Sequence, residues 1–236
     1  MFLDPEESNA SPLVISPIDV SAMVGVKLAV DCEGDLLDSS GNGFNLLATI
    51  APEYLEIDGK LGLWSRASQS IVMVSGIGDY ADLKLYGAAT FHALIFVADQ
   101  ILGSTAIVLN FSGTGETEAA NTLYSLEQQT TGQLSYFHEH GAGVDDRVTL
   151  EWFPPVGRWG LLTVTRRPGA VSGVDCVAYL NGAQIDAWSE ADAPTGGTAA
   201  QIKSSGFAGL LGGFVITNAE QSAADVLAVA EQVGVA

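Results

Sequence analysis

The stretch Val177–Trp188, VAYLNGAQIDAW, decides the fold class because it places a two-residue turn between two segments of alternating side chains. Asn181 and Gly182 tolerate the positive φ that both central residues of a type I′ turn need, so the pair predicts a β-hairpin. A two-residue turn also fixes which residues face each other. One apolar face is predicted to pair Leu180 with Ala183, Ala178 with Ile185, and Cys176 with Ala187.

The opposite face of this hairpin is a candidate ligand site. It is predicted to pair Tyr179 with Gln184, Val177 with Asp186, and Asp175 with Trp188. Sugars stack on aromatic rings and form hydrogen bonds with carboxylates and amides. The candidate sugar-binding residues are therefore Tyr179, Trp188, Asp175, Gln184 and Asp186. The same pattern is typical of a sheet face exposed to water, and the sequence leaves both interpretations open.

Short β-type segments follow one another along the whole chain, separated by Gly, Asn, Asp and Ser. ATFHALIFVA (89–98) is apolar on both faces, which predicts a central strand covered on both sides. DRVTLEWF (146–153) alternates and is predicted to have one wet face. One convincing helix, SAADVLAVAEQVG (222–234), begins with an N-cap and a capping-box pair, Ser222 and Asp225, and ends at Gly234. The class is therefore all-β, an antiparallel β-sandwich with a short C-terminal helix.

Charge excludes several kinds of partner. The 236-residue chain has 9 Lys and Arg against 28 Asp and Glu, a formal net charge of −19. Such a chain repels nucleic acid and anionic membranes. The first residues lack the features of a secretory signal, and no long apolar segment occurs, so we expect synthesis in the cytoplasm.

The chain divides into an arm and one domain. Residues 1–17 contain Pro5, Pro12 and Pro17 and little apolar patterning, which predicts an extended N-terminal arm; residues 18–236 form the single domain. Cys32 and Cys176 lie in strand-like segments and are predicted to be free core thiols, with one disulfide as the alternative.

Catalytic and metal-binding patterns are weak. Glu116 and Glu118 lie in a Gly-rich loop without the third acid of a glucanase strand, so we predict no enzyme activity. His138 and His140 precede Asp145 and Asp146, yet only the two histidines are certain neighbours, and no metal site is predicted. His92 falls in the predicted central strand and is interpreted as a hydrogen-bonded core residue.

Four segments in order resemble the concanavalin A-like lectin/glucanase superfamily, in its laminin-G-like (LamG, pentraxin-like) branch, over residues 18–234. They are the opening strand with its Asp38–Gly43 turn (DSSGNG), RWGLLTVTRRPG from Arg158, the hairpin VDCVAYLNGAQI, and GFAGLLGGFVI before the final helix. The resemblance implies a jelly roll that binds glycans or proteins, or serves as a structural module, without catalysis. The segment IDGKLGLWSRAS keeps Asp58 and Gly59 but lacks a later family acid, so no motif supports calcium and no cofactor is expected.

Three functions follow as expectations. The resemblance to stand-alone LamG-like domains of phage virion proteins favours a structural or decoration protein on the virion surface. Its partners would be other virion proteins or copies of itself, bound through the arm. The alternative is a soluble lectin-type module that binds glycans, and the third, a carbohydrate-active enzyme, is disfavoured by the missing acids.

Overall fold

The fold is seen in a computed structural model that describes residues 14–48, 50–65, 70–75, 87–98, 105–112, 122–139, 145–150, 155–169, 173–190 and 201–236. Within these residues the strands form two antiparallel sheets. The eight-stranded sheet contains, in spatial order, β13 (Ala183–Glu190), β12 (Val174–Leu180), β11 (Trp159–Pro168), β6 (Ala89–Val97), β15 (Gly209–Thr217), β4 (Lys60–Ser65) and β3 (Tyr54–Ile57), with β1 (Val26–Asp31) also paired to β15. The seven-stranded sheet contains β10 (Asp145–Thr149), β9 (Leu134–Glu139), β8 (Thr122–Gln128), β7 (Ala106–Ser112), β14 (Gln201–Ser205), β5 (Ser70–Ser75) and β2 (Leu46–Ala48).

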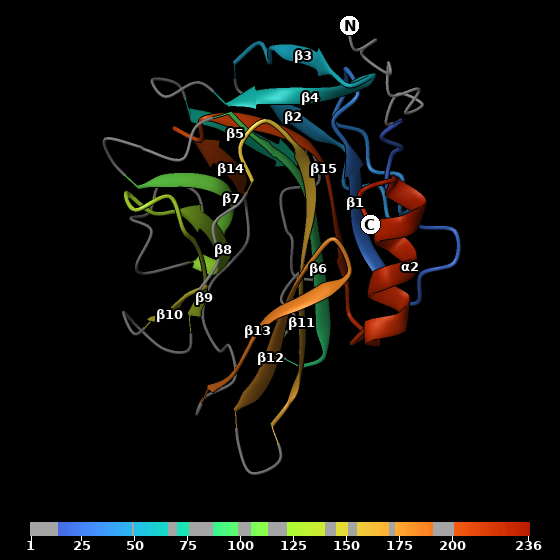
Figure 1. Cartoon of the computed structure of the whole chain (residues 1–236). Coiled ribbons are helices and arrows are strands. Elements are labelled where there is room, and N and C mark those ends of the chain that lie inside the picture. Colours follow the sequence, from blue (N-terminus) through green and yellow to red (C-terminus); the bar gives the residue numbers. More distant parts are fainter. Residues whose placement is uncertain are drawn as a thin grey trace, which may run out of the picture.

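The two sheets pack face to face as a sandwich, and helix α2 (Ala223–Val233) lies on the outer face of the eight-stranded sheet (Figure 1). The main core fills the space between the sheets and includes Leu109 and Phe111 from β7, facing Leu162 and Val164 from β11. Arg166 also reaches this interior, where its guanidinium lies 5.5 Å from the ring centroid of Phe91. The predicted β-sandwich with a C-terminal helix is confirmed.

Strand β6 occupies the predicted central position, between β11 and β15. Ala93 and Ile95 face the core between the sheets, whereas Leu94 and Phe96 belong to a second apolar cluster on the outer face. That cluster includes Ala230 and Val233 of α2, Trp159 and Ile15. Burial on both faces explains why this segment lacks the alternation of a half-exposed strand.

Helix α2 begins and ends as its sequence predicts. Ser222 and Asp225 form both halves of a capping box, and Gly234 takes the left-handed conformation with φ of 89°. The sequence also predicts that Val226, Leu227, Ala230 and Val233 form one apolar stripe of this helix. Of these residues, Val226, Ala230 and Val233 are buried, but Leu227 is 42% exposed, so the helix packs along a narrower stripe than predicted.

The turn over Asp38–Gly43 is fixed by its own side chains. The Asp38 carboxylate accepts hydrogen bonds from the main-chain N–H groups of Ala29, Ser40 and Phe44. The Asn42 amide donates to the carbonyls of Val26 and Lys27 at 3.0 Å. These bonds attach the turn to β1, so its polar residues have a structural role.

The N-terminal boundary of the packed domain lies before residue 18. Residues 1–13 are outside the described residues, but Ile15 is buried beside α2, and the Ser16 N–H donates to the carbonyl of Val233 at 2.9 Å. Residues 14–17, predicted as part of the arm, therefore pack against the C-terminal helix. Cys32 and Cys176 are both buried and form no disulfide with each other, as predicted. None of the helices in the described residues has the length and apolar character to cross a membrane.

Candidate functional site

The predicted hairpin forms, but its register changes beyond the first two pairs. Asn181 and Gly182 have φ of 50° and 81°, and Leu180 pairs with Ala183 and Tyr179 with Gln184, as expected. Ile185 is then an extra residue, a β-bulge, so that Ala178 pairs with Asp186 and Cys176 with Trp188. The predictions of Ala178 opposite Ile185, Cys176 opposite Ala187, Val177 opposite Asp186 and Asp175 opposite Trp188 are wrong. A bulge slips the register by one residue and turns the following side chains to the other face.

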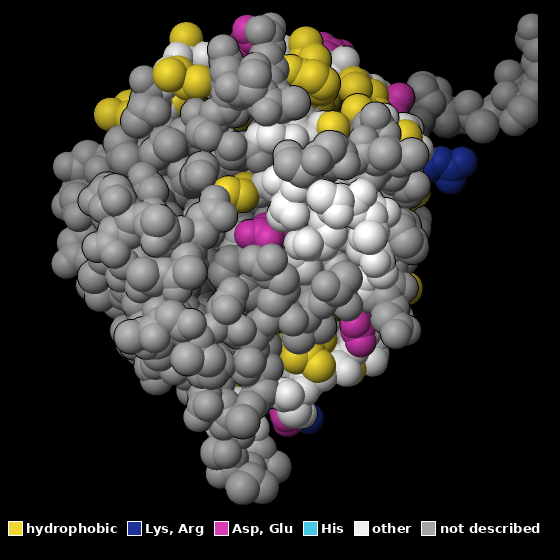
Figure 2. Space-filling model, turned by 90° about the vertical axis from the view of Figure 1, so that its left-hand side faces the viewer, with side chains coloured by type: hydrophobic (Ala, Val, Ile, Leu, Met, Phe, Trp, Pro, Cys, Tyr) yellow, Lys and Arg dark blue, Asp and Glu magenta, His cyan; other side chains and the backbone are white. Residues whose placement is uncertain are grey.

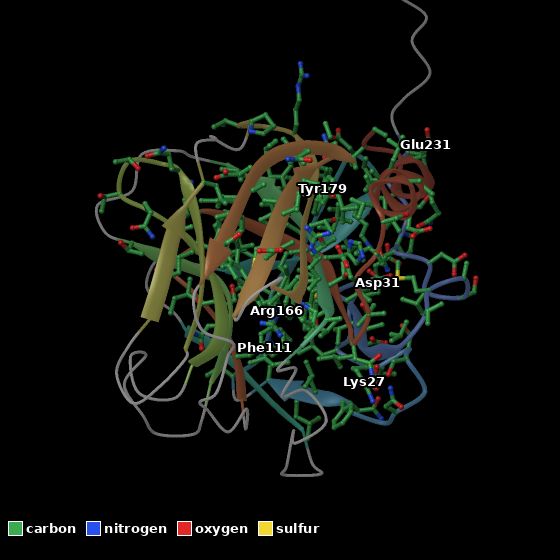
Figure 3. The ribbon with its side chains drawn as sticks, turned by 90° about the horizontal axis from the view of Figure 1, so that it is seen from below. Lys27, Asp31, Phe111, Arg166, Tyr179 and Glu231 are labelled. Atoms are coloured by element: carbon green, nitrogen blue, oxygen red, sulfur yellow. The ribbon has the colours of Figure 1, made fainter. Side chains whose placement is uncertain are left out.

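The five candidate sugar-binding residues consequently do not share one surface. Trp188 turns inward and packs against the core, with its ring 5.8 Å from that of Tyr136 in β9. Tyr179, labelled in Figure 3, is only 6% exposed. Gln184 is exposed and Asp186 half-buried. Asp175 is held by the Ser189 hydroxyl at 2.7 Å and, more weakly, by Arg167, and these contacts lower the pKa of its carboxyl.

Several other candidates fall outside the described residues. Glu116 and Glu118 lie in the undescribed segment 113–121, and His140 in the segment 140–144. The backbones of His138 and Asp146 pair directly between β9 and β10. Across the part of the chain that the structure describes, no group of three His, Cys, Asp or Glu side chains could hold a metal ion.

A polar cluster lies on the face of the seven-stranded sheet that points away from the main core, since its member Glu127 is the neighbour of the core residue Leu126. Figure 2 views the molecule from the side of this sheet. Glu127 pairs with Ser135 across β8 and β9, and the Gln129 amide donates to the Ser135 hydroxyl at 2.6 Å and to the Glu127 carboxylate at 3.4 Å. Glu127 and Ser135 are almost completely buried. Because these side chains are shielded and bonded to each other, we interpret the cluster as structural. Alternation in TLYSLEQ could have placed Ser125 and Glu127 on this face.

Several polar groups converge on a groove of about 290 Å³ beside α2, here called the α2 groove. Three segments line it: the loop before β1 (Asp19, Ala22, Met23 and Val24), the link ahead of the helix (Ala219, Glu220 and Gln221), and one face of α2 (Asp225, Ala228, Val229 and Gln232). The first and last of these segments are some 200 residues apart in sequence.

Hydrogen bonds hold the three segments in place. Gln232 accepts from the Asp19 N–H at 3.0 Å and donates to the Pro17 carbonyl at 2.8 Å, which ties the loop to α2. The buried Thr90 hydroxyl donates to the Ala219 carbonyl and accepts from the Gln221 N–H. The groove is therefore pre-formed on the sandwich.

Gln221 also lines the groove and is only 8% exposed. Its carbonyl oxygen lies 2.9 Å from Nε2 of the buried His92, whose Nδ1 lies 2.8 Å from the Thr163 hydroxyl. Since a carbonyl oxygen only accepts, Nε2 carries the proton and Nδ1 accepts from Thr163. Burial lowers the pKa of His92 to about 4, so the ring is neutral near pH 7. The prediction of a hydrogen-bonded core histidine is confirmed.

The walls of the groove carry three carboxylates. The main-chain N–H and then the hydroxyl of Ser21 lower the pKa of Asp19, and the Ser222 hydroxyl and then its main-chain N–H lower the pKa of Asp225. Both are therefore ionised at neutral pH. Neither these two nor Glu220 forms an ion pair with any described residue. Apolar residues also line the groove, and one of them, Val24, is 75% exposed.

This arrangement suits binding. The groove offers carboxylate acceptors, amide groups and apolar side chains within one cavity, whereas acid–base or nucleophilic catalysis needs a nucleophile, or a pair of groups with separated pKa values. Sequence reasoning identifies Ser222 and Asp225 only as helix caps, because the groove exists only once the N-terminal loop packs on the C-terminal helix.

Comparison with known proteins identifies the fold. No family model and no curated protein matches the sequence. Among solved structures, the botulinum neurotoxin serotype D binding domain matches 88% of this chain with a TM-score of 0.67 and 14% identity. The receptor-binding domain of the C/D mosaic serotype matches 88% with a TM-score of 0.68 and 13% identity. The fold is a lectin-like β-sandwich.

A third similar structure is that of botulinum neurotoxin type C, whose cell entry is dependent upon interaction with two ganglioside molecules; it matches 89% of this chain with a TM-score of 0.62 and 12% identity. This chain covers 52%, 51% and 51% of the serotype D, C/D and type C structures, respectively. It thus spans about half of their length. At these identities the likeness concerns the fold alone.

Proposed function

We propose that this protein is a non-catalytic, lectin-type binding module that recognises glycans through the α2 groove. The observation that carries the proposal is a pre-formed groove, lined by carboxylates and amides, on a lectin-like sandwich. Similar solved structures are receptor-binding domains of botulinum neurotoxins, and cell entry of the type C neurotoxin depends on two ganglioside molecules.

The chemistry of the lining fits a sugar. Carboxylates accept hydrogen bonds from sugar hydroxyls, and the Gln221 amide nitrogen can donate one. Met23, Val24 and Val229 supply apolar contacts for the C–H face of a ring. The lining contributed by the described residues has no aromatic ring, so hydrogen bonds would provide most of the specificity.

A groove-filling variant tests this proposal. Ala228 is exposed on α2 and lines the groove, so Ala228→Trp should fill the cavity without disturbing the core. The matched control is Ala224→Trp, which adds the same side chain to an exposed position outside the groove. Wild-type protein and both variants would be screened on a glycan array.

The expected result is saturable glycan binding by the wild type and by Ala224→Trp, and its loss in Ala228→Trp. Equal binding by all three proteins would exclude the α2 groove as the glycan site. Absence of glycan binding by the wild type would refute the lectin function.

The role on a virion surface stays a prediction. It depends on attachment through residues 1–17, most of which lie outside the described residues, and the comparisons provide no support for viral partners. The glycan-binding alternative is therefore the better supported of the two functions.

A further inference from the structure

The charge of the α2 groove restricts the ligand beyond the class of glycans. Asp19, Glu220 and Asp225 converge on the cavity from three separate segments. Among the described residues no Lys or Arg lines the groove or pairs with these three carboxylates. A neutral sugar would leave these three negative charges without a counter-charge, whereas a ligand that carries cationic groups would be attracted by them.

A bound metal ion does not account for these three carboxylates. The described residues contain no group of three carboxylate, histidine or cysteine side chains close enough to share one ion. Asp19 and Asp225 are also oriented by bonds within their own segments, to Ser21 and Ser222. The carboxylates are therefore spread along the groove, as an organic cation with several N–H donors requires.

The side-chain amide of Gln221 restricts the ligand further. Gln221 is more than nine-tenths buried, and its carbonyl oxygen is occupied by His92. No described residue accepts a hydrogen bond from its amide nitrogen, and Gln221 lines the cavity. This nitrogen is not one of the fully enclosed atoms without a partner, so it can donate to a ligand that brings an oxygen atom to this point.

The geometry points to an oligomer of protonated amino sugars as the ligand of the α2 groove, with ammonium groups near the carboxylates of Asp19, Glu220 and Asp225 and a ring or hydroxyl oxygen at the Gln221 amide. An amino sugar combines a cation, oxygen acceptors and an apolar C–H face on a ring of suitable size. The C–H face would lie against Met23, Val24 and Val229.

That the ligand is a sugar rests on the proposed glycan-binding function. That the ligand is cationic rests on the charges of the groove alone. The two can be tested separately, because acetylation removes the charge of an amino sugar and leaves its ring intact. Oligomers of glucosamine and of N-acetylglucosamine, equal in length, are therefore matched probes.

Isothermal titration calorimetry of the full chain near pH 6 would compare these two oligomers. We expect the amine form to bind at least about tenfold more tightly than the acetylated form, as a charge-assisted contact requires. The preference should decrease between about 50 and about 500 mM NaCl because salt screens the attraction.

Glu220→Gln is the test variant because Glu220 is exposed and makes no hydrogen bond within the described residues. It should weaken binding of the amine form by about tenfold and leave the acetylated form nearly unchanged. Glu231→Gln is the matched control, since Glu231 is an exposed α2 residue outside the groove lining and is labelled at the edge of the molecule in Figure 3.

Equal affinity for the two oligomers, or an equal effect of Glu220→Gln and Glu231→Gln, would overturn the inference. If glycans bind in the array and Ala228→Trp removes them, but amino sugars do not bind, the inference fails and the proposed function stands. A lysine-containing peptide that binds while glucosamine oligomers do not would overturn the sugar as carrier of the charge. Absence of binding to every glycan, both on the array and by calorimetry, would overturn both proposals.

Discussion

The buried His92 predicts a specific loss of stability in weak acid. Burial lowers the pKa of the folded state from 6.5 to about 4. Between these values the unfolded chain binds a proton that the folded protein does not, so the free energy of unfolding falls as the pH falls. Above 6.5 the ring is neutral in both states, and below about 4 it is charged in both, so the loss is confined to this window.

The size of the loss follows from the shift. One pKa unit corresponds to about 1.4 kcal/mol, so the full window contributes about 3 kcal/mol, of which about 2 kcal/mol is lost between pH 7 and pH 5. His92→Gln removes the titrating ring while keeping an amide that can bond to both Thr163 and Gln221. The substitution also changes the free energy of unfolding by an amount that does not depend on pH. Every other group titrates equally in both proteins, so the change of the difference with pH reports on His92.

Urea unfolding of the two proteins at pH 7, 6 and 5 measures the difference. The stability advantage of the wild type over His92→Gln should shrink by about 2 kcal/mol from pH 7 to pH 5. In the folded wild type, the NMR signal of the His92 ring should move by only about a tenth of its full titration shift by pH 5. A stability difference between the two proteins that does not change with pH would contradict a buried, neutral His92 bonded to Thr163 and Gln221. A His92 ring that titrates near pH 6 in the folded protein would contradict it as well.

Three further changes test the packing of the fold, each measured by urea unfolding. Gly209→Ala would place a methyl group against the carbonyl oxygen of Phe96 and should cost about 3 kcal/mol or more, whereas Gly87→Ala, where the space is open, should change stability by less than about 0.5 kcal/mol. Asn181→Ala should cost about 1–2 kcal/mol, because φ is 50° and the side chain accepts a hydrogen bond from β11. Lys60→Met should cost about 1–2 kcal/mol: the buried ammonium pairs with two carboxylates, which are 32% and 40% exposed and can be partly resolvated by water.

Features set by neighbouring residues could be predicted from the sequence. The Asn181–Gly182 turn, the doubly buried β6 and both ends of α2 depend on local φ preferences, side-chain alternation and capping, and the structure confirms each of them. The same local preferences explain Asp58–Gly59, which the family resemblance alone brings to attention in the sequence. These residues have φ of 54° and 76° and form the two-residue turn between β3 and β4.

The bulge at Ile185 shows where local reasoning fails. If side chains alternated strictly after the Asn181–Gly182 turn, Ile185 would face the core and Trp188 would face outward, because the two residues are three positions apart. An extra residue in the strand allows both large apolar side chains to pack against the core, and burying them favours the bulge over a regular ladder. Two large apolar residues at this odd spacing were a signal against the regular register, and hence against a binding face that included Trp188.

The α2 groove could not be predicted, because its parts meet only through tertiary packing. Ile15, Pro17 and Asp19 contact the last helix through one buried side chain and the hydrogen bonds of Gln232, more than 200 residues away. Local patterns identify Asp225 as a cap and Asp19 as a loop residue. Their convergence with Glu220 is a property of the folded chain.

Function and stability should oppose each other in the α2 groove. The folded protein places three like charges along one groove without a described counter-ion, whereas the unfolded chain separates Asp19 from Glu220 and Asp225. Glu220→Gln removes one of these charges and no described hydrogen bond, so it should slightly raise the melting temperature at low salt while it weakens binding of a cationic ligand. The gain should disappear in high salt, and Glu231→Gln should show less of it. A lower melting temperature for Glu220→Gln would mean that Glu220 stabilises the folded chain, and the unbalanced charge could then no longer be attributed to selection for a ligand.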